Sequence, residues 1–425
     1  MRKDGNRRGL AQLFCSAALI GVAGCGGGGA GGEIAAAVPA PAPAATVTGA
    51  PAATPPVSSP GAPSPTPPPA SSVAPGAANA ASAPTLGDCE LFPATAIFNT
   101  RIDDVARFPV HPNSAQWIDV VGRSVPFATD WGVNDNPADY STYWGIPVNI
   151  VDGTAATSEW PVVSFNPPTS VERGYPDKSD CAVPNAGGGF DIARSCGSMP
   201  AGQRRFLYPL PSKALNGGGN CNDPNTCGDH PMLVVEKGAC RLWESYFSYH
   251  LSGQWYASAT AAWDLKSLSM RPYDWGSASA SGLPITPLLA KAAEASSGEI
   301  RHALRVNFRD AALALEVLWP ARFAAGGDNP GAVPFGALLR LKADFVIPDN
   351  WTTQAKALAT AAKRYGLYVS DNGGDFHVGG DPNSAWDLRT NAQMKAITMN
   401  DMEFVDLKSI TGDPRFSRDS MAASW

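Results

Sequence analysis

Side chains capable of acid–base chemistry are concentrated between Asp229 and Leu265. Within this stretch, residues 240–247 alternate so that Glu244 shares one face of an expected strand with Leu242 and Tyr246. A carboxylate among apolar neighbours is either paired or desolvated, and desolvation raises its pKa. Because a raised pKa is what a general acid needs, the sequence makes Glu244 the candidate acid.

A second carboxylate is required if the chemistry is hydrolysis of a glycosidic bond. Retaining enzymes hold two carboxyl groups about 5–5.5 Å apart, and inverting enzymes about 6.5–9.5 Å apart. Asp264 and Asp371 stand at the ends of expected strands, so either could partner Glu244. Asp229 and His230 precede the central hairpin at the mouth of a long loop, where function is often carried. The catalytic candidates are therefore Glu244, Asp371, Asp264, His230 and Asp229.

Aromatic side chains near these carboxylates suggest a sugar substrate. The chain has 12 tryptophans, and an aromatic ring can stack on the apolar face of a pyranose. The same rings could instead be core or loop anchors, which is the commoner role of a single tryptophan. Arg305 lies on a polar strand face that is either a solvated ion-pair surface or the wall of an anion-binding groove. The substrate-binding candidates are Tyr246, Tyr256, Trp255, Trp275 and Arg305.

These candidates favour a glycoside hydrolase or a polysaccharide lyase acting on an extracellular polysaccharide. A lyase would use Tyr246 or His230 as its base, and an arginine would neutralise a uronate. The alternative is a glycan-binding or adhesion lipoprotein that uses the same aromatic loops without chemistry; a structural role is the third option. The GxSxG, HExxH, phosphate-loop and dinucleotide motifs are absent, which removes sequence support for several common enzyme classes.

No cofactor is expected, and Ca²⁺ is the one open option. Asp371 with Asp375, or the oxygen-bearing side chains between Asn220 and Asn225, could supply oxygen ligands, although neither set has EF-hand spacing. The cysteines lack the paired CxxC spacing of a zinc cluster, and the five histidines are scattered. The sequence therefore gives no support for a metal site made of cysteine or histidine.

Strand patterns must position these residues, and they outnumber helical ones. A hairpin is expected over residues 231–247, and a second one over residues 367–379 with its turn at Asp371–Gly374. Residues 255–264 alternate again, with the small polar face of Thr260 and Asp264 either solvated or the floor of a groove. A helix is expected over 352–365, and shorter ones over 287–296 and 388–397. Without strand–helix alternation, this favours a single mainly β domain, an antiparallel β-sandwich or jelly roll with long disulfide-stapled loops and a few helices. Further strands are expected at 146–151, 161–165, 205–210, 302–309, 311–319 and 335–347.

Cysteine usage indicates an exported protein. Of eight cysteines, six fall after residue 86, an even number typical of disulfides. Sequence proximity favours Cys181–Cys196 and Cys221–Cys227, which leaves Cys89 to pair with Cys240. Residues 166–228 are rich in glycine and proline and hold four of these cysteines. We expect this segment to be an excursion stapled over one end of the sheet.

The N-terminus reads as a targeting segment, with basic residues before an apolar run over residues 10–22. It ends in Val22-Ala23-Gly24-Cys25, which resembles the lipobox of bacterial lipoproteins. The resemblance implies a signal peptide at 1–24 and lipidation of Cys25. Residues 25–86 then form an Ala/Pro-rich tether before a globular domain at 87–425. The expected location is the cell envelope, at the outer membrane in a two-membrane bacterium, with the lipid as the only membrane contact.

The formal net charge of −6, with interspersed signs, argues against a nucleic-acid partner. Several stretches of the C-terminal half, including GDHPMLVVEKGACRLWESY, GEIRHALRV and KRYGLYVSDNGGDFHVGG, resemble a group of secreted bacterial proteins without established function. This resemblance spans roughly residues 228–381. It implies one continuous exported domain, and it brings no catalytic residues with it.

Overall fold

The computed structural model describes residues 82–425, which belong to one compact unit. Strands predominate over helices in these residues, so the prediction of a mainly β domain is confirmed. The expected signal peptide, Cys25 and most of the tether lie outside the described residues. The strand β1 (Thr85–Leu86) pairs with β2 (Cys89–Glu90), so the hairpin straddles the expected domain start at Gly87.

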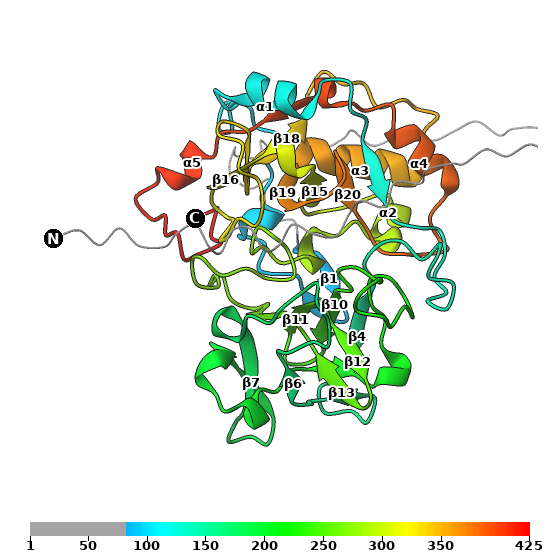
Figure 1. Cartoon of the computed structure of the whole chain (residues 1–425). Coiled ribbons are helices and arrows are strands. Elements are labelled where there is room, and N and C mark those ends of the chain that lie inside the picture. Colours follow the sequence, from blue (N-terminus) through cyan, green and yellow to red (C-terminus); the bar gives the residue numbers. More distant parts are fainter. Residues whose placement is uncertain (1–81) are drawn as a thin grey trace, which may run out of the picture. The chain divides into compact units, whose positions relative to one another are not determined.

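Two larger sheets organise the domain, in the upper and lower halves of the view in Figure 1. The first has six strands in the order β21 (Met402–Phe404), β18 (Leu338–Leu341), β19 (Leu367–Asn372), β15 (Leu304–Phe308), β20 (His377–Gly379) and β3 (Ala128–Asp130). The second has four, in the order β14 (Ala259–Asp264), β11 (Arg241–Tyr246), β10 (Met232–Glu236) and β4 (Val148–Val151).

Smaller sheets and short helices complete the described residues. A three-stranded sheet contains β12 (Tyr249–Leu251), β13 (Gln254–Tyr256) and β6 (Val163–Ser164). Two-stranded pairs are β5 (Ser158–Glu159) with β9 (Tyr208–Pro209), β7 (Asp180–Pro184) with β8 (Phe190–Arg194), and β16 (Leu313–Val317) with β17 (Val333–Phe335). The α-helices are α1 (Ser114–Val121), α2 (Ala292–Ser297), α3 (Thr353–Arg364), α4 (Leu388–Met394) and α5 (Lys408–Thr411).

Parallel and antiparallel pairing are mixed in these sheets. β10–β11 and β11–β14 are antiparallel as expected, but β4–β10, β15–β19 and β3–β20 are parallel. The hairpin expected over residues 367–379 is wrong, because β19 and β20 each pair with β15, which lies between them. Asp371 and Asn372 belong to β19, the N–H of Gly373 still donates to Phe308 O, and the turn lies at Asp375 and Phe376. The expected turn at Asp371–Gly374 is therefore displaced toward the C-terminus, and the expected partner strand is wrong as well.

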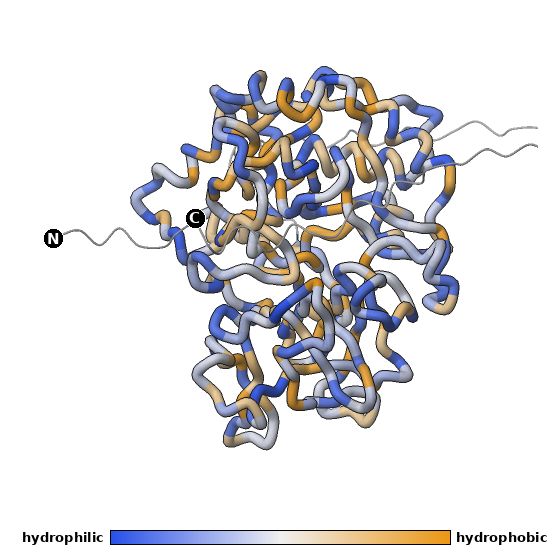
Figure 2. Tube along the Cα trace, in the orientation of Figure 1, coloured by the Kyte–Doolittle hydropathy of each residue, from blue (hydrophilic) through white to orange (hydrophobic). Residues whose placement is uncertain are grey.

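The four-stranded sheet is buried on both faces. Leu242 of β11 packs into the main core with the six-stranded sheet, while its neighbour Trp243 packs into a second core with Trp255. Figure 2 shows hydrophobic and hydrophilic residues closely interleaved along the trace. Successive side chains of a strand point to opposite faces of the sheet, so neighbouring residues of β11 enter different cores. The alternation along these strands, which suggested one solvent-exposed face, therefore separates side chains that enter two different cores.

The helix expected over residues 352–365 is confirmed as α3. The Thr352 hydroxyl accepts a hydrogen bond from the N–H of Ala355 at 3.1 Å, which caps the first turn. At the other end Gly366 adopts a φ of 76°, a left-handed conformation that ends helices. The buried alanines and Leu358 of α3 pack on the six-stranded sheet.

All three predicted disulfides are present: Cys89–Cys240, Cys181–Cys196 and Cys221–Cys227. They indicate that the domain matures in an oxidising compartment outside the cytoplasm. The Cys181–Cys196 bridge ties β7 to the turn after β8, and this hairpin covers the outer face of β14. Thr260 and Ala262, expected to be solvated or to line a groove, are buried beneath it.

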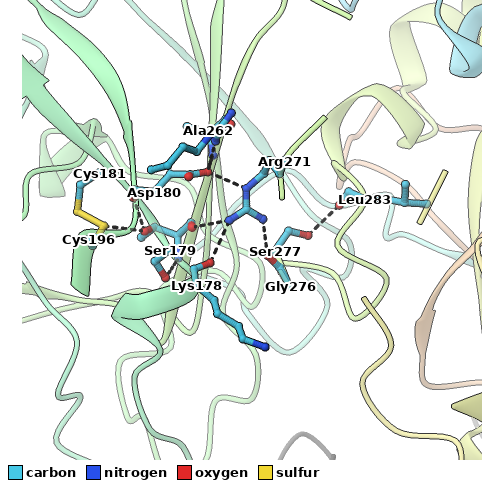
Figure 3. Close-up of polar contacts among 12 residues, drawn as sticks. Lys178, Ser179, Asp180, Cys181, Cys196, Ala262, Arg271, Gly276, Ser277 and Leu283 are labelled. Carbon is cyan, nitrogen blue, oxygen red and sulfur yellow. Dashed lines mark hydrogen bonds and ion pairs between the residues drawn. A yellow bond between two sulfur atoms is a disulfide. The ribbon is translucent and has the colours of Figure 1, made fainter. Parts of the chain in front are cut away.

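A buried ion pair attaches this hairpin to the rest of the domain (Figure 3). Asp180 and Arg271 have fully buried side chains, and the guanidinium Nε donates to the carboxylate at 2.7 Å. The same carboxylate accepts the N–H of Ala262 at 2.8 Å and pairs with Arg194 at 2.6 Å. Arg271 also donates to the carbonyl of Gly276. Burial lowers the pKa of Arg271, and Asp180 opposes that shift.

We expect Asp180→Asn to destabilise the domain strongly, because it leaves two guanidinium groups without their carboxylate. Removing one partner of a buried ion pair costs about 3–5 kcal/mol. Urea unfolding of the full chain measures the loss. Asp191→Asn is the matched control, since Asp191 has a 61% exposed side chain and pairs with Arg241 at 3.4 Å. A loss for Asp180→Asn no larger than that of the control contradicts the assignment.

Candidate functional site

A polar pocket of about 240 Å³ lies where strand ends of the six-stranded sheet meet the loop that leads into β10. β3 ends at Asp130, β19 carries Asp371 near its end, and β15 contributes Arg305 and Asn307. A shift of register between Val306 and Asn307 brings Asp371 opposite Asn307. The polar residues that line the pocket are Asp130, Asp229, His230, Arg305, Asn307, Asp371 and Asn372.

Asp371 and Arg305 form the ion pair of the pocket. The guanidinium Nη2 lies 2.8 Å from Asp371 Oδ2, and the two side chains are 4% and 20% exposed. Arg305 Nε donates to the Ser370 hydroxyl at 3.2 Å, and Asp371 Oδ1 accepts the N–H of Ala280 at 3.2 Å. Burial raises the pKa of Asp371 to about 6, and Asp229 adds to the rise while Arg305 opposes it. Asp371 is therefore ionised at neutral pH and protonated in mild acid.

Asp229 has different surroundings. It is accessible at the pocket mouth, and its Oδ1 accepts a hydrogen bond from the Tyr246 hydroxyl at 3.1 Å. The protein walls around it desolvate the carboxyl group and raise its pKa. The carboxylate of Glu172 lies 3.5 Å from the same hydroxyl. Within residues 82–425 no cationic side chain comes within ion-pair distance of Asp229, whereas Asp371 is paired with Arg305.

The sequence prediction for Glu244 as an acid in the site is not supported by its position. Its carboxylate is completely buried and accepts the N–H groups of Ile285 and Thr286 at 2.8–3.0 Å, and the Thr286 hydroxyl at 2.9 Å. Burial raises its pKa, as expected from its apolar neighbours. Ile285 lines the pocket, so Glu244 fixes the pocket wall and does not face the cavity.

Two other catalytic candidates also lie differently than expected. Asp264 is exposed at the far end of β14, where it accepts the N–H of Lys266 at 2.9 Å, and it does not line the pocket. His230 does line the pocket, but its ring is 4% exposed and its nitrogens lie 2.6 Å from Ser248 O and 3.2 Å from Gly219 O. Burial lowers its pKa. The ring is therefore a neutral anchor for the surrounding loops.

Most of the aromatic candidates also lie outside the pocket. Trp255 is buried, stacks on Tyr208 with 4.1 Å between ring centroids, and donates to Glu159. Tyr256 pairs with Tyr249 in β12–β13, and Trp275 lies beside the guanidinium of Arg271. Tyr246 and Arg305, by contrast, contact the pocket carboxylates. No tryptophan of the described residues lines the cavity, although Trp144, 63% exposed, directly precedes pocket-lining Gly145.

Sequence reasoning did not identify three residues as part of the pocket: Asp130, Asn372, and Asn307 beside Arg305. Asp130 carried no local signal, because β3 is a three-residue strand whose parallel partner β20 is far away in the sequence.

No group of three or more metal-ligating side chains is found among the described residues, and the Ca²⁺ option stays a prediction. Among residues 82–425, no helix is long and apolar enough to span a membrane.

Comparison of the chain with protein-family models, curated proteins and solved structures gives no significant match.

The raised pKa of Asp371 should make stability depend on pH. Its carboxyl group keeps its proton to about pH 6 in the folded chain, against 3.8 for the ordinary group. Protonation therefore stabilises the fold fully below pH 3.8, and this contribution is lost as the pH rises through about 6. Asp371→Asn cannot ionise, so relative to wild type it should gain about 1–3 kcal/mol across that window. Urea unfolding at several pH values tests this. A flat difference between Asp371→Asn and wild type across this window contradicts the assigned pKa.

Glu244→Gln should destabilise the fold by about 1–3 kcal/mol. In wild type the Glu244 carboxylate accepts hydrogen bonds from backbone N–H groups. In the variant the glutamine NH₂ group can face the same N–H groups, and it cannot accept from them. Thermal or urea unfolding measures the loss. Glu299→Gln is the control, because Glu299 has a 56% exposed side chain and lies 3.8 Å from Arg301. Equal stability of the two variants would show that the buried carboxylate contacts are dispensable.

Proposed function

We propose that the protein is a glycoside hydrolase and that this pocket is its active site. One observation carries the proposal: two carboxylates from separate chain segments, Asp229 and Asp371, line one cavity in contrasting surroundings. Arg305 pairs with Asp371 only, whereas Asp229 is held by a neutral tyrosine hydroxyl. Pairs of carboxyl groups whose environments separate their pKa values are typical of acid–base catalysis.

The different surroundings of the two carboxyl groups assign their catalytic roles. Asp371, ionised at neutral pH beside Arg305, acts as nucleophile or as the base that takes a proton from water. Asp229, desolvated and without a cationic partner among residues 82–425, is the acid that protonates the glycosidic oxygen as its bond to the anomeric carbon breaks. The Tyr246 hydroxyl orients Asp229 for that transfer.

A polysaccharide substrate is supported by the dimensions and lining of the site. The cavity of about 240 Å³ is smaller than the roughly 300–1,000 Å³ of pockets for drug-sized ligands, and it suits a single sugar ring. Carboxylate and amide side chains on its wall can bond sugar hydroxyls. Trp144 provides an exposed aromatic surface in the residue next to Gly145. The rest of a longer glycan would extend beyond the pocket.

A hydrolase is favoured over a lyase. A lyase would need Tyr246 or His230 as base and an arginine for the uronate. Burial and the neighbouring Asp229 hold the pKa of Tyr246 far above its ordinary range, so it is a poor base. Both ring nitrogens of His230 face carbonyl oxygens, and Arg305 is occupied by Asp371.

The proposed setting is the cell envelope. Disulfides support maturation outside the cytoplasm, and the lipobox-like Val22–Cys25 supports a lipid anchor at Cys25, on the outer membrane of a two-membrane bacterium. The alternative is a glycan-binding lipoprotein without chemistry. It is favoured by the fact that both carboxylates already have protein partners, as ligand-holding groups often do.

The decisive measurement is product release from a panel of polysaccharides. We expect Asp371→Asn and Asp229→Asn each to reduce kcat/KM by about 10²–10⁴-fold, because each removes a group that acts on the scissile bond. In wild type, kcat/KM should fall as the pH drops below about 6, where Asp371 becomes protonated.

Asp264→Asn is the matched control and should keep wild-type activity. Undiminished release by Asp371→Asn rules out its proposed role. Binding of a glycan without any release by wild type supports the non-catalytic alternative.

A further inference from the structure

We propose that the pocket selects glycans without negative charge. We also propose that Asp130 recognises the bound sugar by accepting hydrogen bonds from the hydroxyl or ammonium groups of that sugar. This inference rests on the proposed glycan-binding function of the same pocket. It adds the charge class of the substrate and a specificity residue that takes no part in the acid–base step.

The charge of the pocket wall is one-sided. Its ionisable lining residues are three carboxylates, Asp130, Asp229 and Asp371, against Arg305 and His230. Arg305 is 4% exposed and is engaged by Asp371 and the Ser370 hydroxyl. His230 is a buried neutral ring between carbonyl groups. The lining therefore offers a ligand no uncommitted positive charge.

A uronate or sulfate entering this pocket would meet the Asp130 carboxylate, and the one lining guanidinium, Arg305, is already paired with Asp371. Like charges at close range in a partly desolvated site repel strongly, and negative ligands are rejected by that repulsion. Sugar hydroxyl and ammonium groups, in contrast, donate hydrogen bonds, which carboxylates accept. The wall thus matches neutral sugars and amino sugars and opposes acidic ones.

Asp130 is distinguished from the other two carboxylates by its lack of a partner. Tyr246 holds Asp229, and Arg305 holds Asp371. The backbone of Asp130 is fixed at the end of β3, in register with Gly379 of β20. Its carboxylate makes no hydrogen bond or ion pair with any other residue in the part of the chain that the structure describes. A positioned acceptor without a partner on a pocket wall is available to a ligand.

The test is glycan-array binding with the full-length protein carrying Asp229→Asn, which blocks turnover and keeps Arg305 paired with Asp371, together with product release by wild type. The array should span neutral, amino-sugar, uronate-containing and sulfated oligosaccharides of varied linkage. We expect the bound and cleaved glycans to be neutral or amino sugars. Preferential binding or cleavage of uronate or sulfated glycans overturns the inference while leaving glycan processing intact. An array and a panel with no bound or cleaved glycan at all overturn the proposed function, and the inference with it.

The role of Asp130 is tested by introducing Asp130→Asn into the protein used on the array and into wild type. We expect the Kd for the best glycan to rise about tenfold or more, and KM in the wild-type background to rise with little change in kcat. Asp264→Asn should leave both constants unchanged. Because Asp130 has no partner in the described fold, its variant should unfold at the wild-type temperature. Unchanged Kd and KM, or a loss confined to kcat, overturn the assignment.

Discussion

The buried pairing of Asp180 with Arg271 is the interaction on which the rest of the domain depends. Two charges are removed from water there and are held by each other and by backbone groups: Asp180 Oδ2 accepts from Arg271 and from the N–H of Ala262, and Arg271 donates to the carbonyl of Gly276. Through Asp180 the disulfide-bonded hairpin is fixed on β14. Through its bond to Gly276, Arg271 fixes the start of the loop whose Ala280 donates its N–H to Asp371. The same contact, drawn in Figure 3, therefore fixes the hairpin on β14 and leads through Gly276 to the loop that contacts Asp371.

Carboxylates serve two different purposes in this fold, and their partners separate them. Asp180 and Glu244 are surrounded by donors, so they act as internal anchors for backbone segments that would otherwise be unpaired. Asp371 and Asp229 are also desolvated, but each has few donors and opens onto a cavity. Burial raises the pKa of Glu244 as it does those of Asp371 and Asp229. A raised pKa alone thus did not identify the site; access to a cavity did.

Local patterns predicted much of the fold. The three disulfides, the helix α3 with its Thr352 cap, and the strands β10 and β11 follow from spacing, capping and alternation that act over a few residues. The failures share one cause. β15 separates β19 from β20, and β7 covers β14, so the hairpin at residues 367–379 and the wet face of β14 were assigned without their true neighbours. The helix α1 was missed as well.

For the site, the sequence alone determined that Asp229, Asp371, Tyr246 and Arg305 carry groups suited to acid–base chemistry and to holding a polar ligand. It also indicated an exported, disulfide-bonded β-rich domain. The tertiary structure decided which of these groups meet: it placed Asp130 beside them, moved Asp264 to a separate surface, and buried Glu244 beneath the pocket wall. The physical reason is that alternation assigns a side chain to a face of its own strand, whereas the environment of that face is made by segments far away in the sequence.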